Sequence, residues 1–193
     1  MGSKGLTKEI IVQEAVALIE ESGQWVISLH ELARRLQVKT PSLYNHIANT
    51  KDLQREVFRC AIHRFVENQK AAIAGKEKDE AIRAFARAYF AFASENKGLY
   101  RLIMSMPLNN DEAEKEMAVP LLETVMELLA GYDLSREACA HWQRVLRAIL
   151  HGFISQEDLG HFYYYKDTEL EKSREIAIQC FLNGLHAKAS HIE

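Results

Sequence analysis

The sequence has few of the residues that interrupt helices, with three prolines and nine glycines among 193 residues. Long stretches consist instead of Ala, Leu, Glu, Lys and Arg, which favour helices. Apolar residues make up 48% and charged residues 26%, a composition typical of a soluble globular protein. The length allows one large domain or two small ones. We therefore predict an all-α fold of about nine helices.

Cysteine is also scarce. The three cysteines, at positions 60, 139 and 180, lie far apart in the sequence and form no C-x-x-C pair. An odd number of distant cysteines indicates reduced thiols in a cytoplasmic protein and argues against a disulfide framework. The N-terminus has no apolar signal region, and no apolar run approaches the length of a membrane span. We therefore expect a cytoplasmic protein with no membrane partner.

The usual signatures of catalysis and metal binding are missing. The sequence has no G-x-S-x-G, no P-loop and no G-x-G-x-x-G. None of its eight histidines forms an H-E-x-x-H pair. His141 and His151 are ten residues apart, so on a helix they do not share a face. We expect no enzyme activity, no metal site and no cofactor.

Charge is distributed unevenly. The whole chain has a net charge of −3, but residues 25–59 carry six basic and three acidic side chains, which leaves −6 for the remainder. A basic segment on an acidic body suits a polyanion-binding head, although solvated helix pairs give a similar pattern. Within it, Arg34 and Arg35 either reach phosphates or are ordinary surface arginines.

The segment Ser28–Leu53 predicts two short helices, a tight turn between them and the start of a third helix. Ser28 and Glu31 form an S-x-x-E capping box, in which each side chain bonds the other's backbone N–H. Thr40 and Pro41 read as the N-cap and first residue of the second helix. Helix, turn and short helix form the arrangement that places a helix in the DNA major groove. The alternative is a three-helix packing unit that binds nothing.

The flanking sequence supplies longer helices. Thr7 to Ser22 is an amphipathic helix with Thr7 as N-cap and Gly23 as C-cap. The helix from Thr50 to about Ala74 spans more than about 30 Å at 1.5 Å per residue, enough to carry a displacement along its length. We predict a DNA-binding domain at 1–53 and a helical ligand-binding and dimerisation domain at 54–193.

The run TPSLYNHI at 40–47, together with the pattern over residues 7–55, resembles the N-terminal domain of the TetR family of bacterial transcriptional regulators. The resemblance implies a homodimeric regulator, a ligand-responsive repressor, that binds a pseudo-palindromic operator in double-stranded DNA. It implies that the second short helix meets DNA. The predicted DNA-binding residues are Ser28, Lys39, Thr40, Pro41, Ser42, Tyr44, His46 and Lys51.

Three positions depart from the family pattern. Gln37 replaces the usual turn glycine, Ile47 replaces the usual aromatic, and Thr50 replaces the usual lysine. We expect Lys51, which follows directly, to pair a phosphate from a different angle. The departures at Gln37 and Thr50 support an alternative function, a helical small-molecule-binding or protein-interaction module that does not bind DNA.

The body of the chain is rich in aromatic residues and methionines, which suit an adaptable pocket for a small apolar effector as well as an ordinary core. The last two long helices, Ser135–Leu159 and Asp167–His186, resemble the pair through which the family forms a four-helix dimer interface. The segment Leu150–Phe153 contains a His-Gly pair and resembles one family subgroup. The predicted pocket residues are Tyr89, Phe92, Tyr100, Met104, Met126, Trp142, Leu146 and His151.

Overall fold

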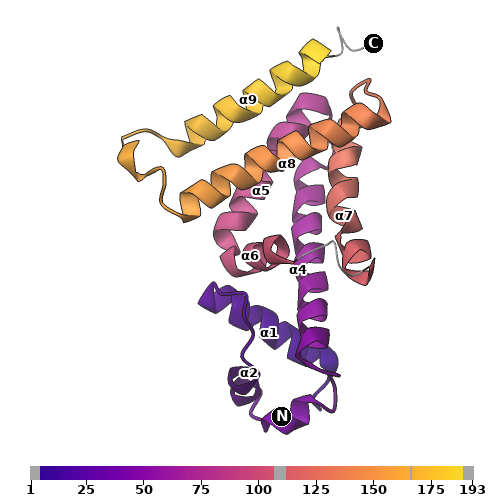
Figure 1. Ribbon diagram of the computed structural model, residues 1–193, viewed down its shortest axis with the longest axis vertical. Coiled ribbons are helices and arrows are strands. Elements are labelled where there is room, and N and C mark those ends of the chain that lie inside the picture. Colours follow the sequence, from indigo (N-terminus) through magenta and orange to yellow (C-terminus); the bar gives the residue numbers. More distant parts are fainter. Residues whose placement is uncertain (1–4, 107–111, 166, 189–193) are drawn as a thin grey trace. The chain divides into compact units, whose positions relative to one another are not determined.

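The computed structural model describes residues 5–106, 112–165 and 167–188, and over these ranges all regular structure is helical (Figure 1). The prediction of an all-α fold with nine α-helices is confirmed for this part of the chain. No helix in it is long and apolar enough to cross a membrane. The elements are α1 Lys8–Ser22, α2 Leu29–Arg35, α3 Thr40–Leu43, α4 Thr50–Ile73, α5 Lys78–Glu95, α6 Lys97–Ser105, α7 Glu112–Leu129, α8 Arg136–Asp158, the 3-10 helix η1 Tyr163–Tyr165 and α9 Leu170–Lys188.

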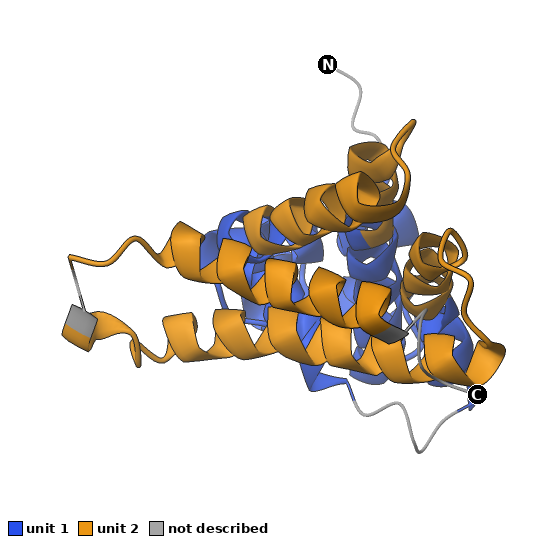
Figure 2. Cartoon of the chain, turned by 90° about the horizontal axis from the view of Figure 1, so that it is seen from above, with its two compact units in different colours: residues 1–65, 92–119 blue, residues 66–91, 120–193 orange. Residues whose placement is uncertain are grey.

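The chain divides into two compact units (Figure 2). Unit 1 comprises residues 1–65 and 92–119, and unit 2 comprises residues 66–91 and 120–193. Unit 1 therefore contains α1 to α3 together with α6 and parts of α4, α5 and α7. The domain boundary at residue 53 stays a prediction.

The first helix of unit 1 forms as its sequence predicts. The Thr7 side chain accepts a hydrogen bond from Ile10 N at 3.3 Å, and Gly23 ends α1 in the left-handed conformation at φ 65°. The apolar stripe of α1 is buried. It packs on α2 and α6, and the start of α4 buries the matching stripe of Leu53, Val57 and Ala61.

Helix α6 lies directly against the backbone of α1. A Cβ atom added to Gly98 would lie 2.3 Å from the carbonyl oxygen of Ile19, so only glycine fits there without a shift of one helix. Beside this contact, Arg101 Nη1 donates to Gly23 O at 3.2 Å. The rings of Phe65 and Phe92 meet edge to face, with centroids 4.9 Å apart. The Gly98 contact and the Arg101 hydrogen bond thus join α6 to α1, and the aromatic pair joins α4 to α5.

Unit 2 is organised around the pair α8 and α9. The Ser135 side chain caps α8 by accepting from Ala138 N at 3.1 Å, as its sequence predicts. Trp142 of α8 meets the ring of Phe181 edge to face at 5.3 Å. A Cβ atom on Gly184 would lie 2.7 Å from the Trp142 ring, so this glycine makes room for the indole.

Three segments of unit 2 meet at Asp79. Its carboxylate accepts from the Tyr132 hydroxyl at 2.7 Å and lies 2.9 Å from His186 Nε2. These residues belong to the start of α5, the connection between α7 and α8, and the end of α9. The cluster therefore fastens the C-terminal end of α9 to the rest of unit 2.

Candidate functional site

Helix α2, the first short helix of the predicted DNA-binding segment Ser28–Leu53, is capped by one half of the expected capping box. Ser28 Oγ accepts from Glu31 N at 3.3 Å. The predicted return bond, donated by Ser28 N to the Glu31 carboxylate, is not formed, and that carboxylate instead accepts two hydrogen bonds from Arg34, at 2.6 and 2.8 Å. Charge-assisted bidentate pairing with a guanidinium is stronger than a bond to a neutral amide.

Gln37 adopts the left-handed conformation at φ 56°, where the family pattern has glycine. Val38 N donates to Ala33 O at 3.0 Å and Gln37 N donates to Arg34 O at 3.2 Å. These two bonds form a Schellman motif with Gln37 at the position that glycine normally takes. The turn therefore keeps its geometry without glycine, at a conformational cost to Gln37.

The second short helix is a single turn, Thr40–Leu43. The prediction of Thr40 as N-cap is wrong by one residue, because the first backbone bond runs from Ser42 N to Lys39 O at 2.8 Å. Lys39 is thus the N-cap, with extended backbone and no side-chain capping bond. After Leu43 the chain turns, with His46 N donating to Leu43 O at 2.9 Å. The second short helix, which the sequence predicts to meet DNA, is therefore one helical turn followed by a tight bend.

Two buried residues hold this turn against the rest of unit 1. Leu43 and Ile47 are both buried, so the aliphatic side chain at 47 fills the core where the family pattern has an aromatic. Tyr44 lies between them in sequence and keeps 51% of its surface exposed. The predicted DNA-binding residues fall into two groups: Ser28, Lys39, Pro41, Tyr44 and Lys51 are exposed, while Thr40, Ser42 and His46 are half-buried.

The start of α4 is fixed by its own capping bonds. Asn49 Oδ1 accepts from Asp52 N at 2.9 Å, and Asp52 Oδ2 accepts from Ala48 N at 3.1 Å. Lys8 of α1 donates to Asp52 at 3.3 Å and to Glu56 at 2.9 Å. The backbone bond from Ala48, followed by the bond from Lys8, lowers the pKa of Asp52 below its usual range. Lys51 thus extends from a well-fixed first turn of α4.

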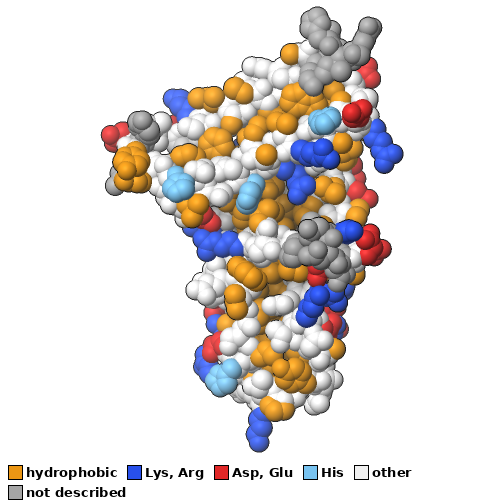
Figure 3. Space-filling view, in the orientation of Figure 1, with side chains coloured by type: hydrophobic (Ala, Val, Ile, Leu, Met, Phe, Trp, Pro, Cys, Tyr) orange, Lys and Arg blue, Asp and Glu red, His pale blue; other side chains and the backbone are white. Residues whose placement is uncertain are grey.

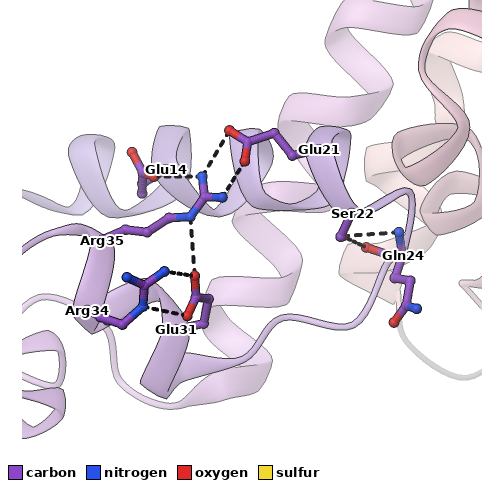
Figure 4. Close-up of polar contacts among 7 residues, drawn as sticks. All are labelled: Glu14, Glu21, Ser22, Gln24, Glu31, Arg34 and Arg35. Atoms are coloured by element: carbon purple, nitrogen blue, oxygen red, sulfur yellow. Dashed lines mark hydrogen bonds and ion pairs between the residues drawn. The ribbon is translucent and has the colours of Figure 1, made fainter.

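The two arginines of α2 are engaged within unit 1 (Figure 4). Arg35 pairs with Glu21 and Glu14 of α1, and its Nε lies 3.5 Å from Glu31. The bonds from Arg34, and then those from Arg35, lower the pKa of Glu31 to about 2. Arg35 therefore braces α2 on α1, whereas Arg34 pairs within α2, and the structural interpretation is favoured over phosphate contact for Arg35.

Other basic residues of segment 25–59 are also paired. Arg59 lies 2.8 Å from Glu56, and Arg55 lies 3.6 Å from the buried Glu114 of α7. Lys39, in contrast, has no ion-pair partner among the residues that the structure describes. Fewer of the six basic residues of segment 25–59 are thus available to bind phosphates than their number suggests, and Lys39 is the one that we assign most directly to such a contact.

The residues predicted to line an effector pocket are distributed over both units. In unit 1, Phe92 and Tyr100 are buried beside Phe65, and Met104 is half-buried. In unit 2, Tyr89 and Leu146 are buried, Met126 and Trp142 are half-buried, and His151 is exposed on α8. The pocket stays a prediction.

Sequence reasoning missed one residue of the body, Gln69. It is only 1% exposed, and neither of its amide atoms has a hydrogen-bond partner among the described residues. A buried amide without partners is rare, because lost hydration is not replaced. The signal was available, since Gln69 continues the buried i, i+4 series of Leu53, Val57, Ala61 and Phe65.

Comparisons with known proteins all find similarity to transcriptional regulators. The family described as "Tetracyclin repressor-like, C-terminal domain" matches residues 82–181. The HTH-type transcriptional regulator Rv0681 of Mycobacterium tuberculosis is 31% identical to this chain, in an alignment that covers 80% of this chain and 72% of Rv0681. The HTH-type transcriptional regulator YobS of Bacillus subtilis is 29% identical over 94% of this chain and 93% of its own. ActR of Streptomyces coelicolor, in complex with (S)-DNPA, superposes with a TM-score of 0.64 at 18% identity, covering 96% and 99% of the two chains.

Proposed function

This chain belongs to the TetR family of DNA-binding transcriptional regulators, and from that premise we propose that it acts as a homodimeric, ligand-responsive repressor in the cytoplasm. The observation that carries the proposal is the single helical turn Thr40–Leu43, anchored by buried Leu43 and Ile47 and followed by exposed Tyr44. Two such turns, one from each protomer, would enter successive major grooves about one helical turn apart.

Each predicted contact residue has a chemical role in this proposal. Tyr44 and His46 bond phosphates or base edges, and Lys39 and Lys51 neutralise phosphates. Thr40 and Ser42 bond bases or phosphates, and Pro41 touches a thymine methyl. The Ser28 hydroxyl accepts the capping bond from Glu31 N and keeps its own proton to donate to a phosphate.

The proposed dimer interface uses α8 and α9. Several large apolar side chains on and beside these helices are exposed, among them Val145 at 44%, Leu159 at 65% and Ile176 at 62%. Apolar side chains lie along α8 on the face in Figure 3, with histidines among them. Exposed apolar surface of this kind marks protein contacts. A symmetric pairing of the two helices would bury it in a four-helix bundle.

The proposed effector is a small, largely apolar molecule bound in the body of the chain. Support comes from the aromatic and methionine content of the body and from ActR, a regulator of the same fold solved in complex with (S)-DNPA. The amide of Gln69, which has no hydrogen-bond partner among the described residues, indicates that the effector carries polar groups as well. A bound molecule with one donor and one acceptor would satisfy both atoms of this amide.

Contacts within unit 1 provide a route from effector to head. The close approach of Gly98 to Ile19 and the bond from Arg101 to Gly23 join α6 to α1. The ion pair between Arg55 and the buried Glu114 joins α4 to the first turn of α7. Any effector that moves α6 or α7 would therefore move α1 and α4, shifting the population between two dimer states.

Selection of bound fragments from random DNA by the purified protein tests the proposal and yields the operator at the same time. We expect one enriched pseudo-palindrome. Lys39→Ala should bind it at least about tenfold more weakly, since a phosphate contact is lost. Lys70→Ala, which removes an exposed lysine of unit 2, should bind normally. No enrichment would favour the alternative module without DNA binding.

A further inference from the structure

Unit 2 contains an open groove of about 430 Å³ between α5 and α9, formed by residues outside the predicted effector pocket. Its volume lies in the range of small-molecule sites. Ala86, Phe90 and Ile178 line it, and all three are buried. The groove therefore has an apolar floor suited to an alkyl or aryl group.

The rim of the groove is positively charged. Four basic side chains and two carboxylates line it, in a chain whose net charge is −3. Arg83 donates to the neutral amide of Gln179. Arg87 and Lys172 are exposed and have no ion-pair partner among the described residues. Arg83, Arg87 and Lys172 thus form no ion pair with a carboxylate among the described residues.

The fourth cation, Arg174, is already engaged. It pairs with Glu157 and with Glu171, and its guanidinium carbon lies 4.5 Å from the centroid of the Phe90 ring. These contacts hold α9 on α5 and on the end of α8. They also use the charge of Glu171, so that Glu175 is the remaining carboxylate of the groove.

We propose that this groove binds a small amphipathic anion, a carboxylate on a short apolar tail. Arg87 would hold the carboxylate through its planar fork of donors, with Arg83 and Lys172 adding charge. The tail would lie on Phe90 and Ala86 and leave the water. The site is separate from the effector pocket, and the proposal does not depend on DNA binding.

Occupation of the groove would bridge α5 and α9. Ile176 forms part of the groove wall and is also exposed on the side of α9 that we assign to the dimer interface. A second copy of the chain that extended past Ile176 over Arg87 would close the groove. Ligand binding by the full-length protein in solution therefore distinguishes a groove open to ligands from one covered by a second copy of the chain.

The test is calorimetric titration of the purified full chain with sodium octanoate, and with octanol, acetate and inorganic phosphate as separate probes. We expect octanoate to bind, with an affinity that falls as salt rises. Octanol lacks the charge and acetate and phosphate lack the tail, so each should bind at least about tenfold more weakly. Equal binding of octanol, or equal binding of phosphate, would overturn the proposal, as would no binding of octanoate.

Variants locate the site. Arg87→Ala should weaken octanoate binding at least about tenfold, because a bidentate charged hydrogen bond is lost. Arg136→Ala removes an exposed arginine of α8 outside the groove and should leave binding unchanged. Since both side chains are exposed, circular dichroism should show an intact fold for each. Octanoate binding that is the same in wild type and Arg87→Ala would contradict this assignment.

Discussion

A Cβ atom on Gly98 would lie 2.3 Å from the carbonyl oxygen of Ile19, so α6 touches the backbone of α1 with no side chain between them. We expect Gly98→Ala to lower the free energy of unfolding by about 1–3 kcal/mol through overpacking. Urea denaturation of both proteins measures this.

Gly131→Ala is the matched control for Gly98→Ala. The added Cβ would meet Lys78 only at 3.5 Å, an ordinary contact, so stability should change by less than about 0.5 kcal/mol. Equal effects of the two substitutions would show that the helices separate easily at Gly98 and would remove this contact from the proposed route to the head.

The turn at Gln37, between α2 and α3, gives a second prediction. Gln37 has φ 56°, a conformation that L residues adopt at a cost and glycine adopts freely. Gln37→Gly should therefore raise the free energy of unfolding by up to about 1 kcal/mol, the gain being reduced by the greater freedom of glycine in the unfolded chain. Glu67→Gly, in the exposed helical backbone of α4, should instead lower it by about 1 kcal/mol. A loss of stability in Gln37→Gly would contradict the Schellman geometry.

The carboxylate of Glu31 makes the stability of the head depend on pH. Arg34 and Arg35 hold its folded pKa at about 2, below the ordinary value of 4.5. A carboxyl group with a depressed folded pKa stabilises the fold fully above its unfolded pKa, and this contribution is lost as pH falls through the folded pKa. We expect Glu31→Gln to be less stable than wild type at pH 7, with a difference that shrinks between about pH 4.5 and 2. Denaturant titrations at pH 7, 5 and 3 measure it, with Glu67→Gln as an unpaired control. A difference that grows towards low pH would refute the assignment.

The buried amide of Gln69 predicts that a core substitution will not lower the free energy of unfolding. Replacing a buried polar group that has no partner by an apolar one of similar size is neutral or stabilising. Gln69→Leu should therefore leave the free energy of unfolding unchanged or raise it by about 1 kcal/mol or more, while weakening effector binding. Gln24→Leu, at an exposed position, serves as the control. A loss of more than about 1 kcal/mol in Gln69→Leu would reveal a hidden partner of the amide.

Much of the fold could be predicted from sequence because its signals are local. Thr7, Gly23 and Ser135 mark helix ends through their own side-chain or backbone chemistry, and each acts as expected. The sequence places the N-cap of α3 one residue late, at Thr40, because Lys39 and Thr40 are both able to begin a helix before Pro41. Only the observed backbone bond from Ser42 N to Lys39 O distinguishes them.

The parts that sequence could not predict depend on partners distant along the chain. Arg35 reads as a surface cation until α1 brings Glu14 and Glu21 beside it. For Gln69 the i, i+4 spacing indicates a buried face, but the absence of a partner for its amide is known only from the fold. The groove at Arg87 requires α5 and α9 to lie side by side, although Arg83 and Gln179, which bond across it, are 96 residues apart.

The most direct test of the central claim is the affinity of Tyr44→Ala for the selected operator, measured by fluorescence anisotropy at several salt concentrations. Tyr44 is exposed beside the anchored turn, so its removal should weaken binding at least about tenfold while the oligomeric state in sedimentation stays unchanged. Tyr163→Ala, at an exposed tyrosine of unit 2, should bind like wild type, and wild-type affinity should fall steeply with salt. Equal affinities of Tyr44→Ala and wild type, or an affinity that is flat between low and physiological salt, would contradict the assignment of this turn as the DNA-reading element.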